Sequence, residues 1–335
     1  MKKLGFAVVG LGRIGKLHAE ILRFKIENAK LVAVVDVVED LARSVAERLG
    51  VKYYTDLDKA LMDSEVDAVV IATPTFLHRD MIIQSARAGK HIFVEKPMTV
   101  TSSEARDVIN AVSAAKVKLM VGYMRRFDHG YRKAKEAVER GEIGRVISFI
   151  SIARDPGPPP GWAAEPSKSG GIFLDQLSHD FDIARWIVGE VSEVYVIGGN
   201  YLYEEIKQRG DLDVVSILFR FENGAQGFIQ GTRRSVFGYD LRTEIYGEKG
   251  TIYIGSNIDN LYAYGSEKGV VYYGIPWFEK RFLDAYVEEL KSFVDAVLND
   301  RDPPITAVDG LRVIQIAEAC WRSVKEGKPV TVPRD

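Results

Sequence analysis

The stretch Leu4–Gly15 reads LGFAVVGLGRIG, a short apolar run followed directly by three glycines in the spacing G-x-G-x-x-G. The run predicts a strand buried on both faces, and the pattern over Ile14–Leu22 predicts a helix. In such a strand–turn–helix unit Gly10 permits a tight turn, Gly12 lets a pyrophosphate approach the backbone, and Gly15 lets the helix pack closely on the strand. The free N–H groups of the helix N-terminus stabilise the anion. The stretch therefore predicts the first unit of a dinucleotide-binding domain.

The first third of the chain continues this alternation of apolar runs and helical patterns. The further runs expected to be strands are Leu31–Val35, Ala68–Ala72, His91–Val94 and Leu119–Val121. Alternation of this kind favours a doubly wound parallel sheet, the Rossmann fold. We therefore predict an N-terminal dinucleotide-binding domain over residues 1–122.

Asp36 indicates which dinucleotide is preferred. It ends the second apolar run about twenty residues beyond the glycine motif, where a carboxylate can accept hydrogen bonds from ribose hydroxyls and repels a 2′-phosphate. Val37 and Val38 follow, and neither supplies the positive charge that a 2′-phosphate would need. NAD is therefore favoured over NADP. The alternative interpretation is an ordinary turn with three glycines and a solvated aspartate.

After residue 122 the pattern changes from alternation to β-rich segments. A helix is expected over His129–Arg140, and the segments expected to be strands are Val146–Ile152, Val191–Ile197, Val214–Phe221, Ala225–Gln230, Leu241–Tyr246 and Thr251–Ile254. Alternating apolar residues in these segments indicate half-buried antiparallel strands. Two helices, Phe282–Leu298 and Thr306–Lys325, close the chain. The overall fold class is therefore α/β, with a C-terminal α+β domain over residues 123–335 that contains a large, mainly antiparallel open sheet.

Composition narrows the classes of partner. The 335 residues suit two domains, and the net charge of −2 (45 basic minus 47 acidic residues) gives no electrostatic footprint for nucleic acid or an anionic membrane. The first apolar run is too short for a signal peptide or a membrane span, so a cytoplasmic protein is expected. The five histidines show no zinc-ligand spacing, and no metal is predicted.

Lys96 is the first candidate catalytic residue. It lies in Glu95-Lys96-Pro97, directly after the predicted strand His91–Val94. Ligands of doubly wound sheets bind beyond the carboxyl ends of the strands. A lysine in that position can hold a substrate hydroxyl and stabilise negative charge that develops on its oxygen. The alternative is an exposed lysine at a strand end.

Asp175 and His179 are the second candidate group. With Asp182 they are spaced i, i+4 and i+7, which puts them on one face of a predicted helix. A histidine that a carboxylate orients can take up a proton while hydride leaves the adjacent carbon. The alternative is an Asp–His pair on a helix surface.

The motifs together, in this order and spacing, resemble the glucose–fructose oxidoreductase/inositol dehydrogenase (Gfo/Idh/MocA) family. The resemblance covers essentially the whole chain and rests on the glycine motif, Ala72-Thr73-Pro74 with His78, Glu95-Lys96-Pro97, Gly122–Phe127, and Asp175 with His179. It implies that the lysine and the Asp–His pair contact the substrate and that the histidine acts as base. It also implies a cofactor site formed by Gly10, Gly12, Arg13, Ile14, Gly15, Asp36, Thr73, Pro74, His78, Glu95 and Arg125.

Within that family the chain looks most similar to inositol 2-dehydrogenases. The supporting segments are Met124–Asp128, Arg154–Pro160, His179–Trp186 and Gly238–Asp240. The implied substrate-binding residues are Lys96, Arg126, Asp155, Asp175, His179 and Tyr239. Four positions depart from the pattern: Ala153 and Asp155 stand where some relatives carry His and Asn, and Gln176 and Ser178 stand where Met and Ile are expected. These departures leave the particular polyol open.

The expected function is NAD-dependent oxidation of a secondary hydroxyl of a cyclic polyol, with myo-inositol converted to the 2-keto-inositol. One alternative is a dehydrogenase of an aldose or sugar derivative, in which Arg126 and Arg154 either serve a phosphate or form salt bridges. A second is a non-catalytic NAD-binding sensor, against which the presence of Lys96, Asp175 and His179 argues. A homo-oligomer, dimer or tetramer, is expected because an open antiparallel sheet must bury its outer face or make it polar.

Overall fold

The computed structural model describes residues 3–255, 258–267 and 269–334. The chain forms two compact units: Met1–Met124 with Asp284–Ile314, and Arg125–Leu283 with Gln315–Asp335. The predicted division after residue 122 treated each domain as one continuous segment. The structure differs, because Asp284–Ile314 packs with the N-terminal unit.

The first unit is built on a six-stranded sheet in the order β3-β2-β1-β4-β5-β6. Its strands are β1 (Leu4–Val9), β2 (Ala29–Val35), β3 (Lys52–Tyr54), β4 (Ala68–Ile71), β5 (His91–Glu95) and β6 (Leu119–Gly122). All neighbouring strands are parallel. The strand order reverses between β1 and β4, which is the switch point where Rossmann folds bind dinucleotides. The predicted fold of this unit is confirmed.

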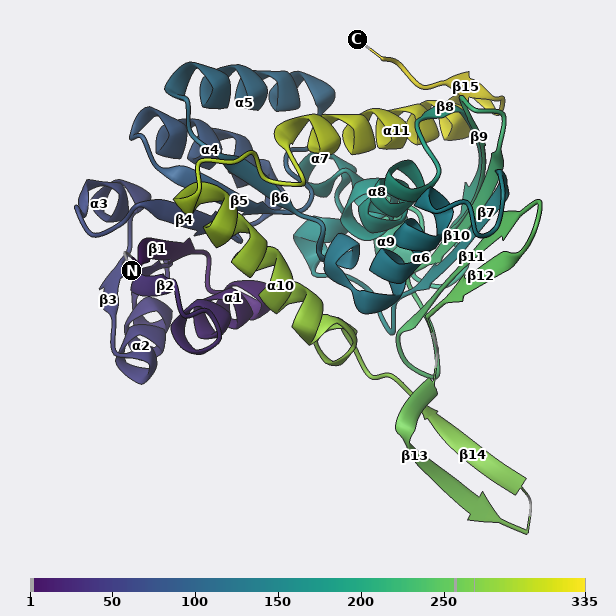
Figure 1. Ribbon diagram of the computed structural model, residues 1–335, viewed down its shortest axis with the longest axis horizontal. Coiled ribbons are helices and arrows are strands. Elements are labelled where there is room, and N and C mark those ends of the chain that lie inside the picture. The colour runs from purple at the N-terminus through teal and green to yellow at the C-terminus, as the bar shows by residue number, and fades with distance from the viewer. Residues whose placement is uncertain (1–2, 256–257, 268, 335) are drawn as a thin grey trace. The chain divides into compact units, whose positions relative to one another are not determined.

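Helices cover both faces of this sheet (Figure 1). They are α1 (Arg13–Phe24), α2 (Glu39–Leu49), α3 (Leu57–Met62), α4 (His78–Arg87), α5 (Ser102–Ala115), part of α10 (Phe278–Leu298) and part of α11 (Ala307–Glu326), with the 3₁₀ turn η1 (Thr75–Leu77). The ring of Phe293 on α10 packs edge-on against Phe6 at 6.2 Å and Phe93 at 5.9 Å between ring centroids. These buried aromatic contacts explain why the C-terminal segment belongs to the N-terminal unit.

The second unit contains a seven-stranded sheet in the order β12-β11-β7-β10-β9-β8-β15. The strands are β7 (Val146–Arg154), β8 (Val191–Gly199), β9 (Val214–Phe221), β10 (Gln226–Thr232), β11 (Asp240–Gly247), β12 (Thr251–Ile254) and β15 (Val330–Thr331). Only β7 and β10 pair in parallel among these described strands. The predicted mainly antiparallel sheet is confirmed, and the parallel pair of β7 and β10 makes it a mixed sheet.

The remaining elements of the second unit include a hairpin that the sequence did not predict. Strands β13 (Ile258–Ser266) and β14 (Gly269–Gly274) pair with each other and stand away from the large sheet (Figure 1). The helical elements are η2 (Met124–Phe127), α6 (His129–Glu139), η3 (Gly161–Ala164), α7 (Pro166–Ser169), η4 (Ile172–Gln176), α8 (Ser178–Ile187) and α9 (Glu204–Gln208), with the start of α10 and the end of α11. The predicted continuous helix through Asp175–Asp182 is instead divided, because η4 is a π-helical turn and α8 begins after it.

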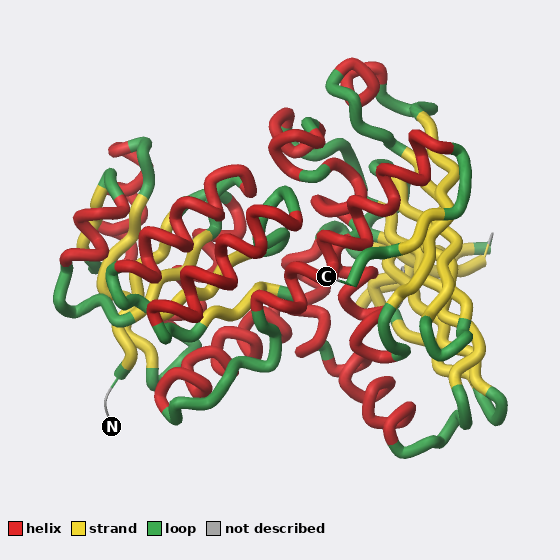
Figure 2. The backbone as a smooth tube through the Cα atoms, turned by 90° about the horizontal axis from the view of Figure 1, so that it is seen from above, coloured by secondary structure: helices red, strands yellow, loops and turns green. Residues whose placement is uncertain are grey.

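The two faces of the seven-stranded sheet differ. On β9 the residues Val215, Ile217, Phe219 and Phe221 are buried, whereas Leu218 is exposed. Figure 2 shows helices against one face of this sheet and, among the described residues, none against the other. No described helix combines the length and the apolar character that crossing a bilayer requires.

Candidate active site

The glycine motif has the geometry that a pyrophosphate requires. Gly10 has a φ of +87°, and a Cβ there would lie 2.8 Å from the carbonyl oxygen of Ala72. A Cβ on Gly15 would lie 1.8 Å from the carbonyl oxygen of Gly10, so only glycine lets α1 pack this closely. At Gly12, by contrast, a Cβ would meet nothing within 4 Å among the described residues. Gly12 also begins α1 without a side-chain cap, so the N-terminus of the helix is open to an anion.

Asp36 lies beside this turn and is held by backbone groups. Its Oδ2 accepts a hydrogen bond from the backbone N–H of Leu11 at 2.8 Å, and its Oδ1 accepts one from Val38 at 3.0 Å. A carboxylate has about four acceptor sites, so it can accept ribose hydroxyls in addition. The residues Arg13 and Ile14 open α1 next to the turn. The residues present therefore fit a dinucleotide.

His78 connects two of the predicted cofactor segments. The ring is buried, with Nδ1 2.8 Å from the carbonyl oxygen of Pro97 and Nε2 2.8 Å from that of Thr73. Burial lowers the pKa of His78, although the two carbonyl contacts oppose that shift. The imidazole thus ties the segment Thr73-Pro74 to the loop after β5. Contact between His78 and the cofactor remains a prediction.

Glu95 points into a buried cluster of ionisable groups in the first unit. Its Oε1 lies 2.6 Å from Nε2 of His18, and its Oε2 accepts the backbone N–H of Lys96 at 3.2 Å. Glu289 from α10 is fully buried. One ring nitrogen of His18 and one carboxylate oxygen each of Glu95 and Glu289 lie within 4.8 Å of one another. Burial and the charge of Glu95 raise the pKa of Glu289 well above its ordinary value.

The sequence predicted neither His18, the partner of Glu95, nor the nearby Glu289. His18 lies within the apolar stripe of α1 formed by Gly15, Ala19 and Leu22, and a histidine in such a stripe is a readable sign of a buried polar contact. Glu289 gave no comparable sign, because it comes from a helix that is distant in the sequence. The peptide bond between Lys96 and Pro97 is cis.

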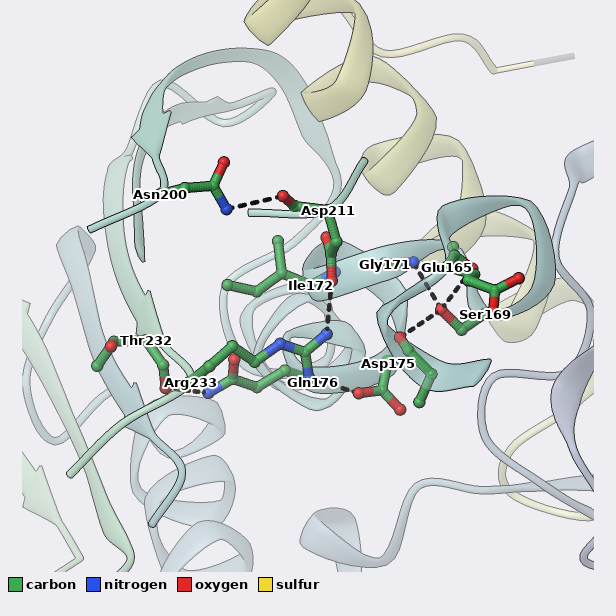
Figure 3. Close-up of polar contacts among 12 residues, drawn as sticks. Glu165, Ser169, Gly171, Ile172, Asp175, Gln176, Asn200, Asp211, Thr232 and Arg233 are labelled. Carbon is green, nitrogen blue, oxygen red and sulfur yellow. Dashed lines mark hydrogen bonds and ion pairs between the residues drawn. The ribbon is translucent and has the colours of Figure 1, made fainter. Parts of the chain in front are cut away.

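Asp175 forms an ion pair that the sequence did not predict. Its Oδ2 lies 2.5 Å from Nη1 of Arg233, whose Nη2 lies 3.1 Å from Oδ2 of Asp211 (Figure 3). Arg233 is fully buried, whereas the side chain of Asp175 is 22% exposed. His179 is also buried and lies on α8, one turn further along the chain.

Two predicted arginines are paired with carboxylates of α8. Arg125 is fully buried, and its Nη1 donates to Oδ1 of Asp180 at 2.8 Å. Burial alone would lower the pKa of Arg125, but the charge and hydrogen bond of Asp180 and the nearby Tyr131 and Tyr239 together outweigh burial, and the pKa is raised. Arg126 makes two bonds to Asp182, at 2.9 Å and 2.6 Å. Each guanidinium therefore already has a counter-ion within its own unit.

Asp155 and Tyr239 lie at the same edge of the large sheet as Arg233. Asp155 follows β7, Arg233 follows the parallel strand β10, and Tyr239 precedes the antiparallel strand β11. The charge of Asp155 acts on both Arg233 and Tyr239. Burial raises the pKa of Tyr239, and its ring packs 5.4 Å from that of Trp277. The structure thus brings Asp155, Tyr239 and the Asp175–Arg233 pair together.

A Rossmann unit with an open glycine turn and an α+β unit that carries a cluster of acid–base groups define a dinucleotide-dependent oxidoreductase. The sequence also matches two family profiles. The profile described as an oxidoreductase family with an NAD-binding Rossmann fold covers residues 4–123, and that of the GFO/IDH/MocA C-terminal domain covers residues 131–253. The chain belongs to the Gfo/Idh/MocA family of NAD-binding oxidoreductases.

Similar proteins include enzymes that act on inositols. The chain is 40% identical over 330 residues to a myo-inositol 2-dehydrogenase of Thermotoga maritima, covering 96% of this chain and 97% of the relative. It is 40% identical over 326 residues to a scyllo-inositol 2-dehydrogenase (NAD⁺) of Bacillus subtilis, covering 97% and 95%. A crystal structure of scyllo-inositol dehydrogenase from Lactobacillus casei with bound NAD(H) and scyllo-inositol superimposes with a TM-score of 0.92 at 34% identity, covering 99% of each chain.

Proposed function

We propose that the protein catalyses the NAD-dependent oxidation of a ring hydroxyl of an inositol, with myo-inositol converted to the 2-keto-inositol. The observation that carries this proposal is the full-length similarity to inositol 2-dehydrogenases in a chain that holds Lys96, Asp175 and His179 in the family's motifs. The similarity spans both units, so it includes the cofactor turn and the sheet edge at which Asp155 and Tyr239 lie.

The proposed roles follow from the chemistry of each side chain. His179 takes up the hydroxyl proton as general base, and Asp175 supports the positive charge that then develops on the imidazole. Lys96 holds the reacting oxygen and stabilises its developing negative charge. When bound, NAD supplies the acceptor for the hydride that leaves the carbon. The alcohol thus loses one hydride and one proton and becomes a ketone.

The charge pattern of the second unit favours a neutral polyol over a phosphorylated sugar. Arg125 and Arg126 are paired with carboxylates, and Arg154 lies 3.4 Å from Asp240 and donates to Gln230 at 2.5 Å. A phosphate would have to compete with those partners. Asp155 and Asp175 instead offer carboxylate oxygens, which accept hydrogen bonds from hydroxyl groups.

The test is NADH formation with myo-inositol, scyllo-inositol, glucose, galactose and xylose, each measured with NAD and with NADP. We expect the highest kcat/KM with an inositol and NAD. Activity on an aldose alone would support the proposed reaction type but would show that the substrate is a sugar and not an inositol. Binding of NAD without turnover on any of these compounds would favour the sensor alternative.

We also propose that the protein is a cytoplasmic homotetramer. The helix-free face of the large sheet exposes Ile197, Leu218, Tyr246 and Tyr253, with exposed fractions of 61%, 55%, 49% and 75%. Strand register places all four on this face. Apolar patches of this kind mark protein–protein contacts. Light scattering of the purified protein tests the subunit number, and a Leu218→Glu variant should shift the mass towards smaller species. Fractionation of cells that express the protein tests the location.

A further inference from the structure

Arg233 occupies a position that is costly for a cation. It directly follows β10 and is fully buried, and its guanidinium bridges Asp175 at 2.5 Å and Asp211 at 3.1 Å (Figure 3). Burial lowers the pKa of Arg233, but the charges of Asp175 and Asp211 outweigh burial and the pKa is raised. A buried charge of this kind is tolerated only when it is paired on more than one side, as it is here.

Asp211 connects Arg233 to the start of the π-helical turn η4. It is buried, and its Oδ1 accepts the backbone N–H of Ile172, the first residue of η4, at 2.9 Å. Burial raises the pKa of Asp211, and Arg233 opposes that shift. Gly171 has a φ of +65°, and a Cβ there would lie 2.5 Å from the same Oδ1. The carboxylate of Asp211 therefore fixes where η4 begins.

Gln176 holds the other end of η4. Its Nε2 donates to the carbonyl oxygens of Ala153 at 3.1 Å and Thr232 at 2.8 Å, at the ends of β7 and β10 (Figure 3). Asp175 is thus carried on a turn whose first and last residues are both tied down, and its carboxylate is bonded to Arg233. π-helical turns are rare and occur mostly at functional sites.

We propose that Arg233 is a positioning residue for the reaction, acting through Asp175. The inference rests on the proposed function, in which Asp175 supports His179. Arg233 is 0% exposed and Asp175 is 22% exposed, so a substrate that approaches this edge meets the carboxylate and not the guanidinium. Arg233 and Asp211 set the place and direction of the Asp175 carboxylate before substrate binds. Such preorganisation fixes catalytic groups more firmly than substrate binding alone.

The test is a double-mutant cycle between Arg233→Lys and Asp175→Asn. Lysine keeps the positive charge but cannot bridge two carboxylates with a planar fork. Because misplacing a catalytic group by about 1 Å costs roughly 100-fold, we expect Arg233→Lys to lower kcat by about 10- to 100-fold. In the Asp175→Asn background the same substitution should lower kcat by less than about 3-fold, since the group through which it acts is already impaired.

Arg185→Lys is the matched control. Arg185 is another arginine of this unit with a largely buried side chain, and it pairs at 2.6 Å and 3.0 Å with Glu190, which follows α8 in the chain. Arg185→Lys should lower Tm without changing kcat. Affinity for NADH, measured by fluorescence titration, should be unchanged in all of these variants, because Asp175, Arg185 and Arg233 are not among the predicted cofactor-binding residues.

Each outcome separates this inference from the proposed function. If Asp175→Asn retains normal kcat, the role proposed for Asp175 is wrong. If Asp175→Asn is slow but Arg233→Lys lowers kcat by an equal factor in both backgrounds, Arg233 has only a structural role and the inference is overturned. Should Arg233→Lys fail to fold, Asp211→Asn replaces it in the same cycle, because that variant loosens the start of η4 while the guanidinium stays.

Discussion

Replacing Glu289 by Gln should make the protein more stable at neutral pH, by an amount that grows with pH. Glu289 is fully buried beside Glu95, and both burial and that neighbouring charge raise the pKa of Glu289 well above its ordinary value. The folded protein therefore keeps a proton on Glu289 at pH values where the unfolded chain has lost it. Stability of the wild type falls as pH rises through that window, because the folded state binds the extra proton.

The magnitude follows from the linkage of one proton. Between the ordinary pKa of a glutamate and the raised pKa in the fold, each pH unit removes about 1.4 kcal/mol from the free energy of unfolding. Glutamine does not titrate, so the difference in the free energy of unfolding between Glu289→Gln and wild type should grow with every pH unit inside that window. The change for one pH unit corresponds to roughly 3–6 °C in Tm for a domain of this size.

The assay is thermal or urea unfolding of both proteins at several pH values in that range. Glu288→Gln is the matched control, because Glu288 precedes Glu289 on α10, is half-exposed and pairs with Lys291 at 2.7 Å. The control should follow the pH profile of the wild type. If the profiles of Glu289→Gln and wild type are parallel, Glu289 is ionised in the folded protein and the reasoning about the buried cluster is wrong.

Three further outcomes test the site directly. His179→Ala should lower kcat by roughly 100- to 10,000-fold, the usual contribution of a general base, while NADH affinity stays the same; near-normal turnover would remove His179 from the mechanism. Gly12→Ala should weaken NAD binding by at least about 10-fold without lowering Tm, because its φ of −63° suits alanine and nothing lies within 4 Å of the added Cβ; unchanged affinity would place the pyrophosphate elsewhere. Asp36→Ser should improve the ratio of NADP to NAD in kcat/KM, because the carboxylate that repels a 2′-phosphate is gone; an unchanged ratio would assign cofactor choice to other residues.

The parts of the fold that were predictable from sequence are those that local patterns determine. The strands β1, β9 and β12 match the predicted segments at both ends, because each is a run with a clear apolar period between turn residues. The strand β3 was missed, since Lys52–Tyr54 is short and largely solvent-facing. The parallel pairing of β7 with β10 joins strands that are not consecutive, and no local pattern carries that information.

In the candidate site, too, the features that local patterns determine were predictable and those that depend on tertiary contacts were not. The glycine turn and Asp36 lie within one βαβ unit, so their spacing alone predicts their proximity. Arg233 is 58 residues from Asp175 in the sequence. No local pattern around Arg233 distinguishes a buried arginine from one on the surface. The π-helical turn was also unpredictable, because its extra residue per turn is stabilised by Asp211 and Gln176 through tertiary contacts.

The two buried clusters, one around Glu95 and one around Arg233, have the same arrangement, which explains why charged groups are retained in both cores. Glu95 directly precedes Lys96 in the chain and is held by His18 behind it, at 2.6 Å. Arg233 lies behind Asp175 and is in turn held by Asp211. In each unit a residue proposed to act on the substrate is therefore fixed by an ionisable group that is itself buried.

Apolar residues of similar volume are often as stabilising as a buried ion pair. Apolar residues in place of Arg233 and His18, however, would form no bond to the carboxylates of Asp175 and Glu95 and would not hold them in one rotamer. The clusters therefore orient the side chains proposed to act on the substrate and add little to the free energy of unfolding. The variant Glu289→Gln tests this argument in the Rossmann unit, because a gain in Tm with unchanged kcat would mean that the buried Glu289 carboxyl group has no part in placing Lys96.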